Sequence, residues 1–243
     1  MQPSFVETDL HRLAYRAQAG ASPTVMFLTG FKSDMTGSKA EALAADCAAR
    51  GQAFIRFDYS GHGQSSGEFR DGTIGRWKRD VLHIFDTLTQ GEVILVGSSM
   101  GAWLALLAAL ERPERVKALV GVASAPDFTE RLIWEKLTPT QKESLLREGV
   151  FYAPSCYGEE PYPITLQLIE EARTHLLLDR EIPIRCPVRL LHGTADEDVP
   201  LEIPQLLAKK LPQAALTIIE GGNHRLSEKA DLQLLYDAVC ANN

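Results

Sequence analysis

Short apolar runs alternate with longer helical patterns along this chain of 243 residues. Residues 92–97 contain Val-Ile-Leu-Val without polar alternation, which is typical of a strand covered on both faces. Residues 73–89 carry apolar side chains at helical spacing and predict an amphipathic helix. Residues 100–110 are apolar nearly all round and predict a buried helix. This alternation is the pattern of βαβ units and predicts a mostly parallel central sheet with helices on both faces.

The same patterns predict the remaining core elements. An antiparallel strand pair is expected at one edge of the sheet, over residues 4–7 and 12–16. Helices are expected over residues 38–50 and 229–241. Further strands are expected over residues 24–29, 53–58, 117–123, 188–191 and 215–219.

One segment interrupts the alternation. Between residues 123 and 187 the patterns predict helices over 128–137, 139–147 and 164–178, and no clear strand. We interpret residues 125–187 as a helical cap inserted after the sixth strand, and residues 1–124 with 188–243 as the core. Such a cap is expected over the ends of the strands, where ligands bind in open α/β sheets.

Composition narrows the classes of function. A net charge of −7 argues against nucleic acid as a main partner, because phosphate binding needs clustered Lys and Arg. No apolar run approaches the roughly 18 residues that span a membrane, so no membrane span is expected. The cysteines Cys47, Cys156, Cys186 and Cys240 form no C-x-x-C pair, which favours reduced thiols over a zinc or redox site.

The strongest chemical signal is Gly-Ser-Ser-Met-Gly at residues 97–101, which fits the pattern G-x-S-x-G. A buried strand is expected directly before it and a buried helix directly after it. That strand-turn-helix setting predicts a nucleophile elbow with Ser99 as the nucleophile. A serine cap of a helix is the structural alternative. Ser98 is the rival nucleophile, but it stands at the variable position of the pattern.

A serine hydroxyl needs a base to remove its proton, and the base needs an acid to orient it. In this type of site the order along the chain is serine, acid, histidine. His224 is the only histidine after the acidic loop at residues 192–200. Within that loop Asp196, Glu197 and Asp198 compete, and Asp196 is preferred, with Asp198 as the main alternative. We expect no metal there, because no ligand cluster with regular spacing surrounds these residues.

An oxyanion hole needs two backbone N–H donors. One is expected at Met100, directly after the nucleophile, and the second at Phe31, in the loop after the strand at 24–29. The Gly-rich segment 58–65 misses the G-x-G-x-x-G spacing of dinucleotide sites, so we interpret it as a turn with a structural His62. No organic cofactor is expected.

Four landmarks, at residues 58–61, 97–101, 192–196 and 223–224, resemble those of the α/β hydrolases in order. More narrowly, residues 55–61, 96–99, 189–193 and 228–235 resemble a mitochondrial family of animal palmitoyl-protein thioesterases that also cleave the acyl glucuronide of mycophenolic acid, and its bacterial relatives. The resemblance covers nearly the whole chain. It implies an α/β-hydrolase fold and an esterase or thioesterase with Ser99, Asp196 and His224 as its triad. Most α/β hydrolases have His-Gly where this chain has Thr29-Gly30.

Together these features predict a serine hydrolase that cleaves carboxylic esters or thioesters of small molecules or acylated proteins. The same triad would serve acyl transfer to another acceptor, or hydrolysis of amide or C–C bonds. A non-catalytic binding protein on this scaffold is the alternative of another class. Because the first residues show neither a signal peptide nor a mitochondrial extension, the expected location is cytoplasmic. The apolar cap residues are expected to pack the cap and to line an acyl pocket: Phe128, Ile133, Trp134, Leu137, Phe151, Tyr152, Tyr157, Tyr162, Leu166 and Ile169.

Overall fold

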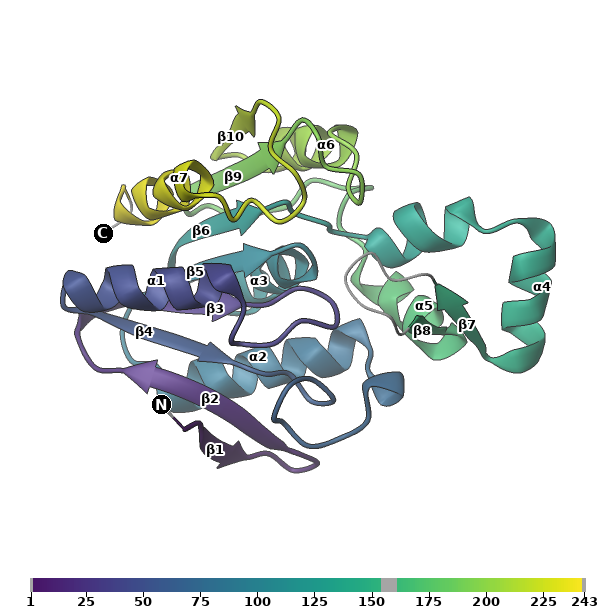
Figure 1. Ribbon diagram of the computed structural model, residues 1–243, viewed down its shortest axis with the longest axis horizontal. Coiled ribbons are helices and arrows are strands. Elements are labelled where there is room, and N and C mark those ends of the chain that lie inside the picture. The colour runs from purple at the N-terminus through teal and green to yellow at the C-terminus, as the bar shows by residue number, and fades with distance from the viewer. Residues whose placement is uncertain (1, 154–160, 242–243) are drawn as a thin grey trace.

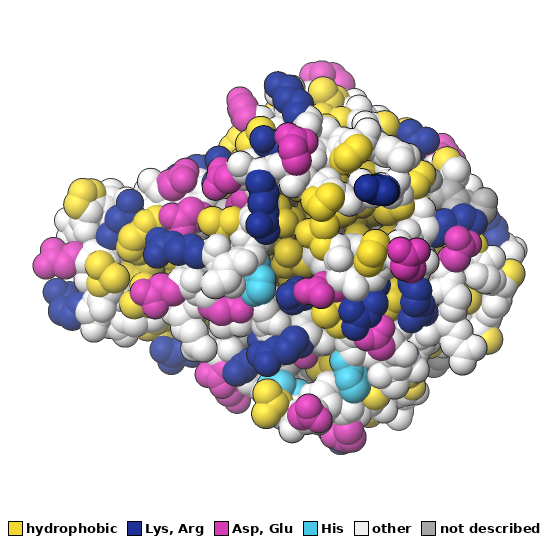
Figure 2. All heavy atoms as spheres, turned by 180° about the vertical axis from the view of Figure 1, so that it is seen from behind, with side chains coloured by type: hydrophobic (Ala, Val, Ile, Leu, Met, Phe, Trp, Pro, Cys, Tyr) yellow, Lys and Arg dark blue, Asp and Glu magenta, His cyan; other side chains and the backbone are white. Residues whose placement is uncertain are grey.

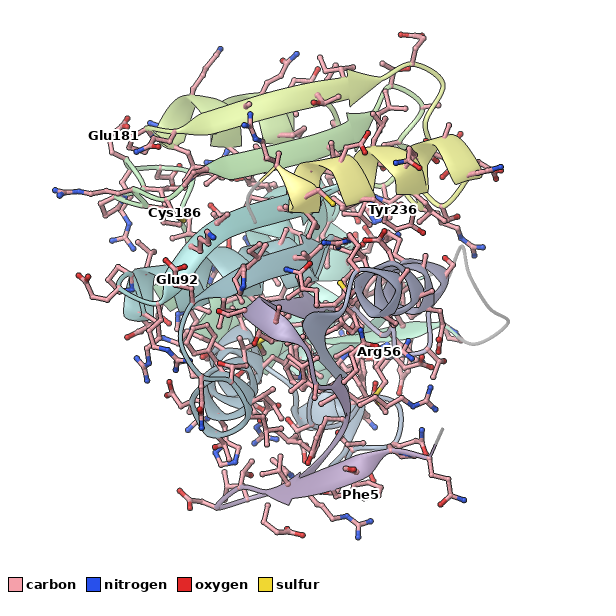
Figure 3. All side chains as sticks on the ribbon, turned by 90° about the vertical axis from the view of Figure 1, so that its left-hand side faces the viewer. Phe5, Arg56, Glu92, Glu181, Cys186 and Tyr236 are labelled. Carbon is pink, nitrogen blue, oxygen red and sulfur yellow. The ribbon has the colours of Figure 1, made fainter. Side chains whose placement is uncertain are left out.

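The computed structural model describes residues 2–153 and 161–241, and this part of the chain is built around an eight-stranded sheet (Figure 1). The strand order is β1-β2-β4-β3-β5-β6-β9-β10. The β1–β2 and β2–β4 pairings are antiparallel and the others are parallel. β1 forms one edge, where Phe5 is exposed (Figure 3). The strands are β1 (Ser4–Glu7), β2 (Arg12–Gln18), β3 (Ala21–Leu28), β4 (Gln52–Phe57), β5 (Val93–Ser98), β6 (Val116–Val122), β9 (Val188–Gly193) and β10 (Ala214–Ile219).

Helices cover both faces of this sheet. One face packs against α1 (Ser38–Ala49) and α7 (Lys229–Cys240). The other packs against α2 (Ile74–Leu88), α3 (Met100–Glu111) and α6 (Glu202–Lys210). Successive side chains of a strand point to opposite faces, so Val25 and Phe27 of β3 join the first layer and Met26 and Leu28 the second. Burial on both faces explains why the central strands lack polar alternation.

Most of the core elements expected from the sequence are confirmed, including the antiparallel pair at the edge and the insertion after the sixth strand. One helix, α6, was not predicted. Its sequence carries Pro204 at the third position, and proline usually interrupts a helix. In the first turn, however, the missing N–H is one that the helix leaves unpaired, so the proline is tolerated there.

The described residues between β6 and β9 lie beyond the ends of the parallel strands (Figure 1). The expectation that they contain no strand is wrong, because β7 (Val150–Ala153) and β8 (Tyr162–Thr165) form a two-stranded antiparallel sheet. Each has only four residues and Pro163 lies within β8, so neither produced a recognisable strand pattern. The limits of the cap at residues 125–187 stay a prediction.

The helices of this segment are shorter than predicted. α4 (Pro139–Glu148) agrees with the sequence, but the expected helix 128–137 is a π-helical turn (Thr129–Ile133) followed by a 3-10 turn (Trp134–Lys136). The expected helix 164–178 is α5 (Leu166–Ala172) followed by a 3-10 turn (Arg173–His175). The Thr165 side chain accepts a hydrogen bond from the Leu168 N–H and so starts α5 two residues later than expected. A further 3-10 turn lies at Phe69–Asp71.

The rear face of the molecule carries basic and acidic side chains interspersed with apolar ones (Figure 2). Ion pairs join α2 to the end of α3. Lys78 lies 3.0 Å from Glu111, and Arg112, the residue directly after α3, lies 2.7 Å from Asp86. None of the helices in the described residues combines the length and apolar character needed to cross a bilayer.

Three of the cysteines lie in the described part of the chain and are free thiols, Cys47, Cys186 and Cys240. Burial raises the pKa of the Cys47 thiol to about 11, so this thiol stays protonated and packs as a small apolar side chain. Cys156 and Tyr157, singled out in the sequence, lie outside the described residues.

Candidate active site

Ser99 stands in the sharp turn between β5 and α3, with φ of 54° and ψ of −119°. Few residues other than glycine adopt a positive φ, and the surrounding structure must hold such a residue in place. The Ser99 N–H donates a hydrogen bond of 2.9 Å to the carbonyl of Val122 on β6, and the Ser99 carbonyl accepts one of 3.0 Å from Ala102 on α3. The turn thus raises the serine above the carboxyl ends of the strands.

The two glycines of the motif are required by close approach of the backbone. A Cβ atom on Gly97 would lie 2.4 Å from the carbonyl oxygen of Gly101. A Cβ atom on Gly101 would lie 2.2 Å from the carbonyl oxygen of Leu28 on β3. The strand, the turn and the helix therefore pack closely enough that side chains at either position would push them apart.

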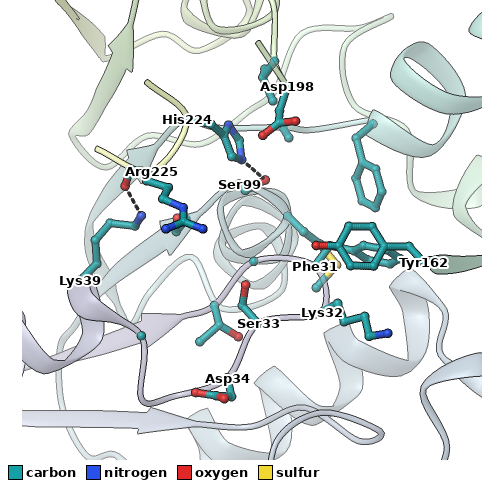
Figure 4. A pocket seen from close by; sticks show the side chains of 18 of the residues that line it. Phe31, Lys32, Ser33, Asp34, Lys39, Ser99, Tyr162, Asp198, His224 and Arg225 are labelled. Carbon is teal, nitrogen blue, oxygen red and sulfur yellow. Dashed lines mark hydrogen bonds between the residues drawn. The ribbon is translucent and has the colours of Figure 1, made fainter. Parts of the chain in front are cut away.

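A hydrogen-bonded chain joins the three predicted triad residues, each of which follows a different strand. The Ser99 Oγ lies 3.1 Å from Nε2 of His224 (Figure 4). The other ring nitrogen of His224, Nδ1, lies 2.8 Å from Oδ2 and 3.0 Å from Oδ1 of Asp196. These contacts involve Ser99 rather than Ser98, and Asp196 rather than Asp198. The arrangement leaves Nε2 of His224 directed at the serine hydroxyl.

The carboxylate of Asp196 is fixed and ionised. Its side chain is 1% exposed, and Oδ1 accepts N–H hydrogen bonds from Asp198 at 3.0 Å and Val199 at 2.8 Å. Burial by itself raises the pKa of Asp196, but the hydrogen bond and charge of His224 together with the Val199 N–H outweigh it, so the pKa lies below its ordinary value.

A second histidine supports the acidic loop. His192, on β9, is fully buried, and its Nε2 lies 3.0 Å from the carbonyl oxygen of Val199 and 3.6 Å from Oδ2 of Asp196. Burial lowers the pKa of His192 and outweighs the nearby carboxylate, so the ring is neutral and Nε2–H can donate to Val199. This contact closes the loop around Asp196.

Two backbone segments border the Ser99 hydroxyl. Met100 is the first residue of α3, so its N–H has no partner within the helix and lies at the positive end of the helix dipole. The loop after β3 passes the other side, because a Cβ atom on Gly30 would lie 3.5 Å from Cβ of Ser99. Met100 and Phe31 line the same cavity as Ser99 and His224.

The cavity above Ser99 has a volume of about 830 Å³ and two unlike sides (Figure 4). The side toward the cap is mainly apolar, lined by Phe31, Phe128, Leu132, Ile133, Tyr162 and Ile164. The opposite side is polar, lined by Ser33, Asp34, Lys39 and Arg225. An elongated apolar group can therefore lie on one side of the serine while a polar group lies on the other.

The apolar cap residues divide between the two predicted tasks. Of the ten named from the sequence, Phe128, Ile133 and Tyr162 line the cavity. Others pack around Leu145 in a small cluster inside the segment: Trp134, Leu137, Phe151, Leu166 and Ile169. Tyr152 is exposed. Leu132 and Ile164 were missed, because only the folded segment shows which face of each element is turned toward Ser99.

Within the described residues, one group of side chains presents ligand-type atoms close together. Asp196, Asp198 and His224 each offer one such atom within 4.8 Å of the others. Both oxygens of Asp196 and Nδ1 of His224 are engaged with each other. The donor set is thus explained by the hydrogen-bonded chain, and we assign it no metal.

Lys39 gives the polar side of the cavity a pH-dependent charge. Its Nζ donates to the carbonyl oxygen of Arg225, and burial, with repulsion from Arg225, lowers the pKa of Lys39 from 10.5 to about 8. Between these two pKa values Lys39 holds its proton in the unfolded chain and not in the folded chain, so the free energy of unfolding rises with pH.

This linkage predicts how the stability of a Lys39→Met variant compares with that of the wild type. In scanning calorimetry, the Tm of the wild type should rise relative to the Tm of Lys39→Met between pH 8 and pH 10. A difference in Tm that stays constant or falls over this range would contradict the assignment.

A family model described as the alpha/beta hydrolase fold matches residues 23–156, more than half of the chain. This chain belongs to the α/β-hydrolase family. The match spans the elbow and the loop that contains Phe31, and the family places the chain among the hydrolases. The predicted fold class is confirmed.

Within the α/β-hydrolase family, this chain is similar to a group of proteins named as thioesterases. The palmitoyl-protein thioesterase ABHD10, mitochondrial, of Bos taurus is 45% identical over 230 residues, which cover 93% of this chain and 75% of that protein. The Homo sapiens protein of the same name is 44% identical with the same coverage. The resemblance inferred from the sequence motifs is therefore confirmed.

Solved structures agree with these relatives. The structure of alpha/beta hydrolase domain-containing protein 10 from mouse superposes with a TM-score of 0.92 at 40% identity, covering 99% of this chain and 98% of that one. A protein from Agrobacterium vitis S4 described as a hydrolase gives a TM-score of 0.94 at 38% identity, covering 99% of this chain and 97% of that one. The described residues of this hydrolase, including those between β6 and β9, therefore follow a fold that is already observed in these two structures.

The expectation of a cytoplasmic location is wrong by this comparison. Five relatives that are 43–45% identical are named as mitochondrial proteins. The expectation rested on the first residues of this sequence, whereas the chain covers 75–77% of the length of those relatives. The first residues of this α/β hydrolase therefore do not decide its compartment.

Proposed function

We propose that this α/β hydrolase cleaves acyl esters or thioesters through an acyl-enzyme formed on Ser99. The observation that carries the proposal is the hydrogen-bonded chain from Ser99 through His224 to Asp196 at the floor of a cavity with one apolar side. Relatives named palmitoyl-protein thioesterases support an acyl substrate.

In the first half of the reaction, Ser99 Oγ attacks the carbonyl carbon while Nε2 of His224 takes its proton. Asp196 holds Nδ1–H and stabilises the imidazolium that forms. The N–H groups of Phe31 and Met100 donate to the oxyanion of the tetrahedral intermediate. The intermediate then expels the alcohol or thiol, which leaves with the proton from His224, and the acyl group remains on Ser99.

In the second half, water replaces the leaving group. The water oxygen attacks the acyl carbon while Nε2 of His224 takes a proton from the water. The N–H groups of Phe31 and Met100 donate to the oxyanion of this second tetrahedral intermediate. The intermediate collapses to a carboxylic acid, and the proton on His224 returns to Oγ of Ser99. We place the acyl chain against the apolar side of the cavity and the leaving group, such as a cysteine-containing peptide or a small alcohol, on the side of Lys39 and Arg225.

Activity should rise with the length of the acyl chain. Each methylene buried in the apolar side contributes at most about 0.8 kcal/mol, so kcat/KM should increase about three- to fourfold per methylene until the pocket is full. A series of p-nitrophenyl esters from acetyl to dodecanoyl, kept below aggregating concentrations, measures this. A preference for acetyl over octanoyl would contradict the placement of the acyl chain.

Two additions sharpen this experiment. Leu132→Trp, which fills the apolar side, should shift the optimum to shorter chains, whereas Leu146→Trp, at an exposed position of α4, should not. An acyl-cysteine peptide that is cleaved faster than the oxygen ester of the same chain would favour thioesters as the natural substrate. Recovery of the acyl group on an added amine or alcohol, rather than as free acid, would favour acyl transfer instead.

A further inference from the structure

The segment 58–65, which the sequence suggested to be a plain turn, contacts the loop that carries Phe31. The Tyr59 hydroxyl donates to the carbonyl oxygen of Thr29 at 3.1 Å, and Thr29 lies two residues before Phe31. Oδ1 of Asp58 accepts the N–H of Met35 at 2.7 Å, four residues after it. Both ends of the loop are thus held by residues that directly follow β4.

Between these two contacts lies a third, made by His62. The backbone N–H of Lys32, the residue directly after Phe31, donates to Nε2 of His62 at 3.2 Å. Lys32 has φ of 52°, a conformation that costs free energy for a residue with a side chain. A bond to its N–H fixes the peptide plane between Phe31 and Lys32, and with it the direction in which the loop passes Ser99.

The surroundings of His62 suit an acceptor. The ring is 4% exposed and packs edge-on against Tyr59, Phe69 and Trp77, with ring centroids 5.4, 5.1 and 5.1 Å away. Nδ1 lies 3.3 Å from the carbonyl oxygen of Ser60, so Nδ1 carries the proton and donates it there. Burial lowers the pKa of His62 to about 4, which keeps the ring neutral and the lone pair of Nε2 free for the N–H of Lys32.

The position of His62 is itself fixed by a buried network. The Ser60 N–H and hydroxyl both donate to Oδ2 of Asp80, at 2.8 and 2.7 Å. Nε1 of Trp77 donates to the Ser60 carbonyl at 3.1 Å. The ring of Phe31 contacts the same aromatic cluster, 5.9 Å from Trp77. The backbone and the side chain of the loop therefore rest on one rigid support.

We propose that His62 is a positioning residue for the oxyanion hole, which holds the Lys32 N–H so that the Phe31 N–H stays directed at the carbonyl oxygen of the bound acyl group. The proposal rests on the proposed function, since it needs an oxyanion at Ser99. His62 touches no reacting atom. It acts through the loop, and its effect belongs to the transition state rather than to substrate binding.

The experiment compares His62→Leu, which has no acceptor, with His62→Gln, whose Oε1 can replace Nε2. Removing an oxyanion donor costs about 10²–10³ in kcat, so a loosened donor in His62→Leu should cost roughly tenfold to hundredfold, with KM little changed. An octyl trifluoromethyl ketone, which forms a hemiketal oxyanion on Ser99, should bind more weakly by the same factor. The analogue in which an ether oxygen replaces the ketone carbonyl fills the cavity but cannot form an oxyanion. Its affinity for His62→Leu should equal its affinity for the wild type. His62→Gln should recover most of both losses.

The control is His83→Leu, since His83 lies on α2 and does not line the cavity. This substitution should change the affinity for neither the ketone nor the ether. Equal loss of ketone and ether binding, or no loss in His62→Leu, would overturn the positioning role. Failure of the ketone to inhibit the wild type would instead count against the proposed function. If His62→Leu does not fold, ¹⁵N spectra of the wild type decide, because a proton on Nε2 rather than Nδ1 at neutral pH would leave His62 unable to accept from Lys32.

Discussion

Replacing Ser99 by alanine should lower kcat for p-nitrophenyl octanoate by about 10⁴- to 10⁶-fold, the largest effect expected of any single substitution in this protein. The variant keeps the cavity and the backbone N–H donors but has no hydroxyl to attack the acyl carbon. In the proposed reaction His224 and Asp196 act only through that hydroxyl, so their presence should not compensate for its loss. A fluorophosphonate probe, which modifies activated serines, should label the wild type and leave Ser99→Ala unlabelled.

The matched control is Ser98→Ala, one residue earlier on β5. Nε2 of His224 is hydrogen-bonded to the hydroxyl of Ser99, so Ser98→Ala should retain labelling and most of the turnover. Labelling that persisted in Ser99→Ala and disappeared in Ser98→Ala would show that Ser98, and not Ser99, is the nucleophile. Circular dichroism of both variants verifies that the fold is kept.

Asp196→Asn should lower kcat by about 10⁴-fold while leaving the cavity intact. The amide N–H of an asparagine can donate to Nδ1 of His224, which favours the tautomer whose proton is on Nε2. A protonated Nε2 cannot accept the proton of the Ser99 hydroxyl. Steady-state kinetics of the purified variant measure the loss. Although burial raises it, the pKa of Asp196 lies below its ordinary value, mainly because His224 donates to it, so the wild-type residue acts as a carboxylate.

Asp198→Asn is the control for this substitution. Asp198 supports Asp196 through its backbone N–H, at 3.0 Å, and the substitution keeps that group. We expect a loss of less than about tenfold, because the tautomer of His224 is unaffected. A larger loss for Asp198→Asn than for Asp196→Asn would mean that the acid of this site had been misassigned.

The sequence alone determined most of the core. The unbroken apolar run of β5, the two glycines around Ser99 and the apolar sequence of α3 are local signals, and local periodicity and turn chemistry are what a sequence records directly. The order of Ser99, the acidic loop and His224 along the chain was equally readable, because each follows a strand of a parallel sheet. Elements with short or proline-containing sequences, β7, β8 and α6, were not readable, since tertiary packing outweighs weak local preference there.

The tertiary structure alone decided how these parts meet. Asp196 and Asp198 stand two residues apart in one acidic loop, and only the folded loop shows that Asp196 reaches His224. His62 gave no chemical signal in its Gly-rich turn, because its partner Lys32 lies thirty residues earlier in the chain. Contacts of this kind depend on which strands lie side by side, here β4 and β3, and on the burial that makes an imidazole neutral. The residues that neighbour a strand or a histidine in the sequence determine neither which distant strand it pairs with nor whether its ring is buried.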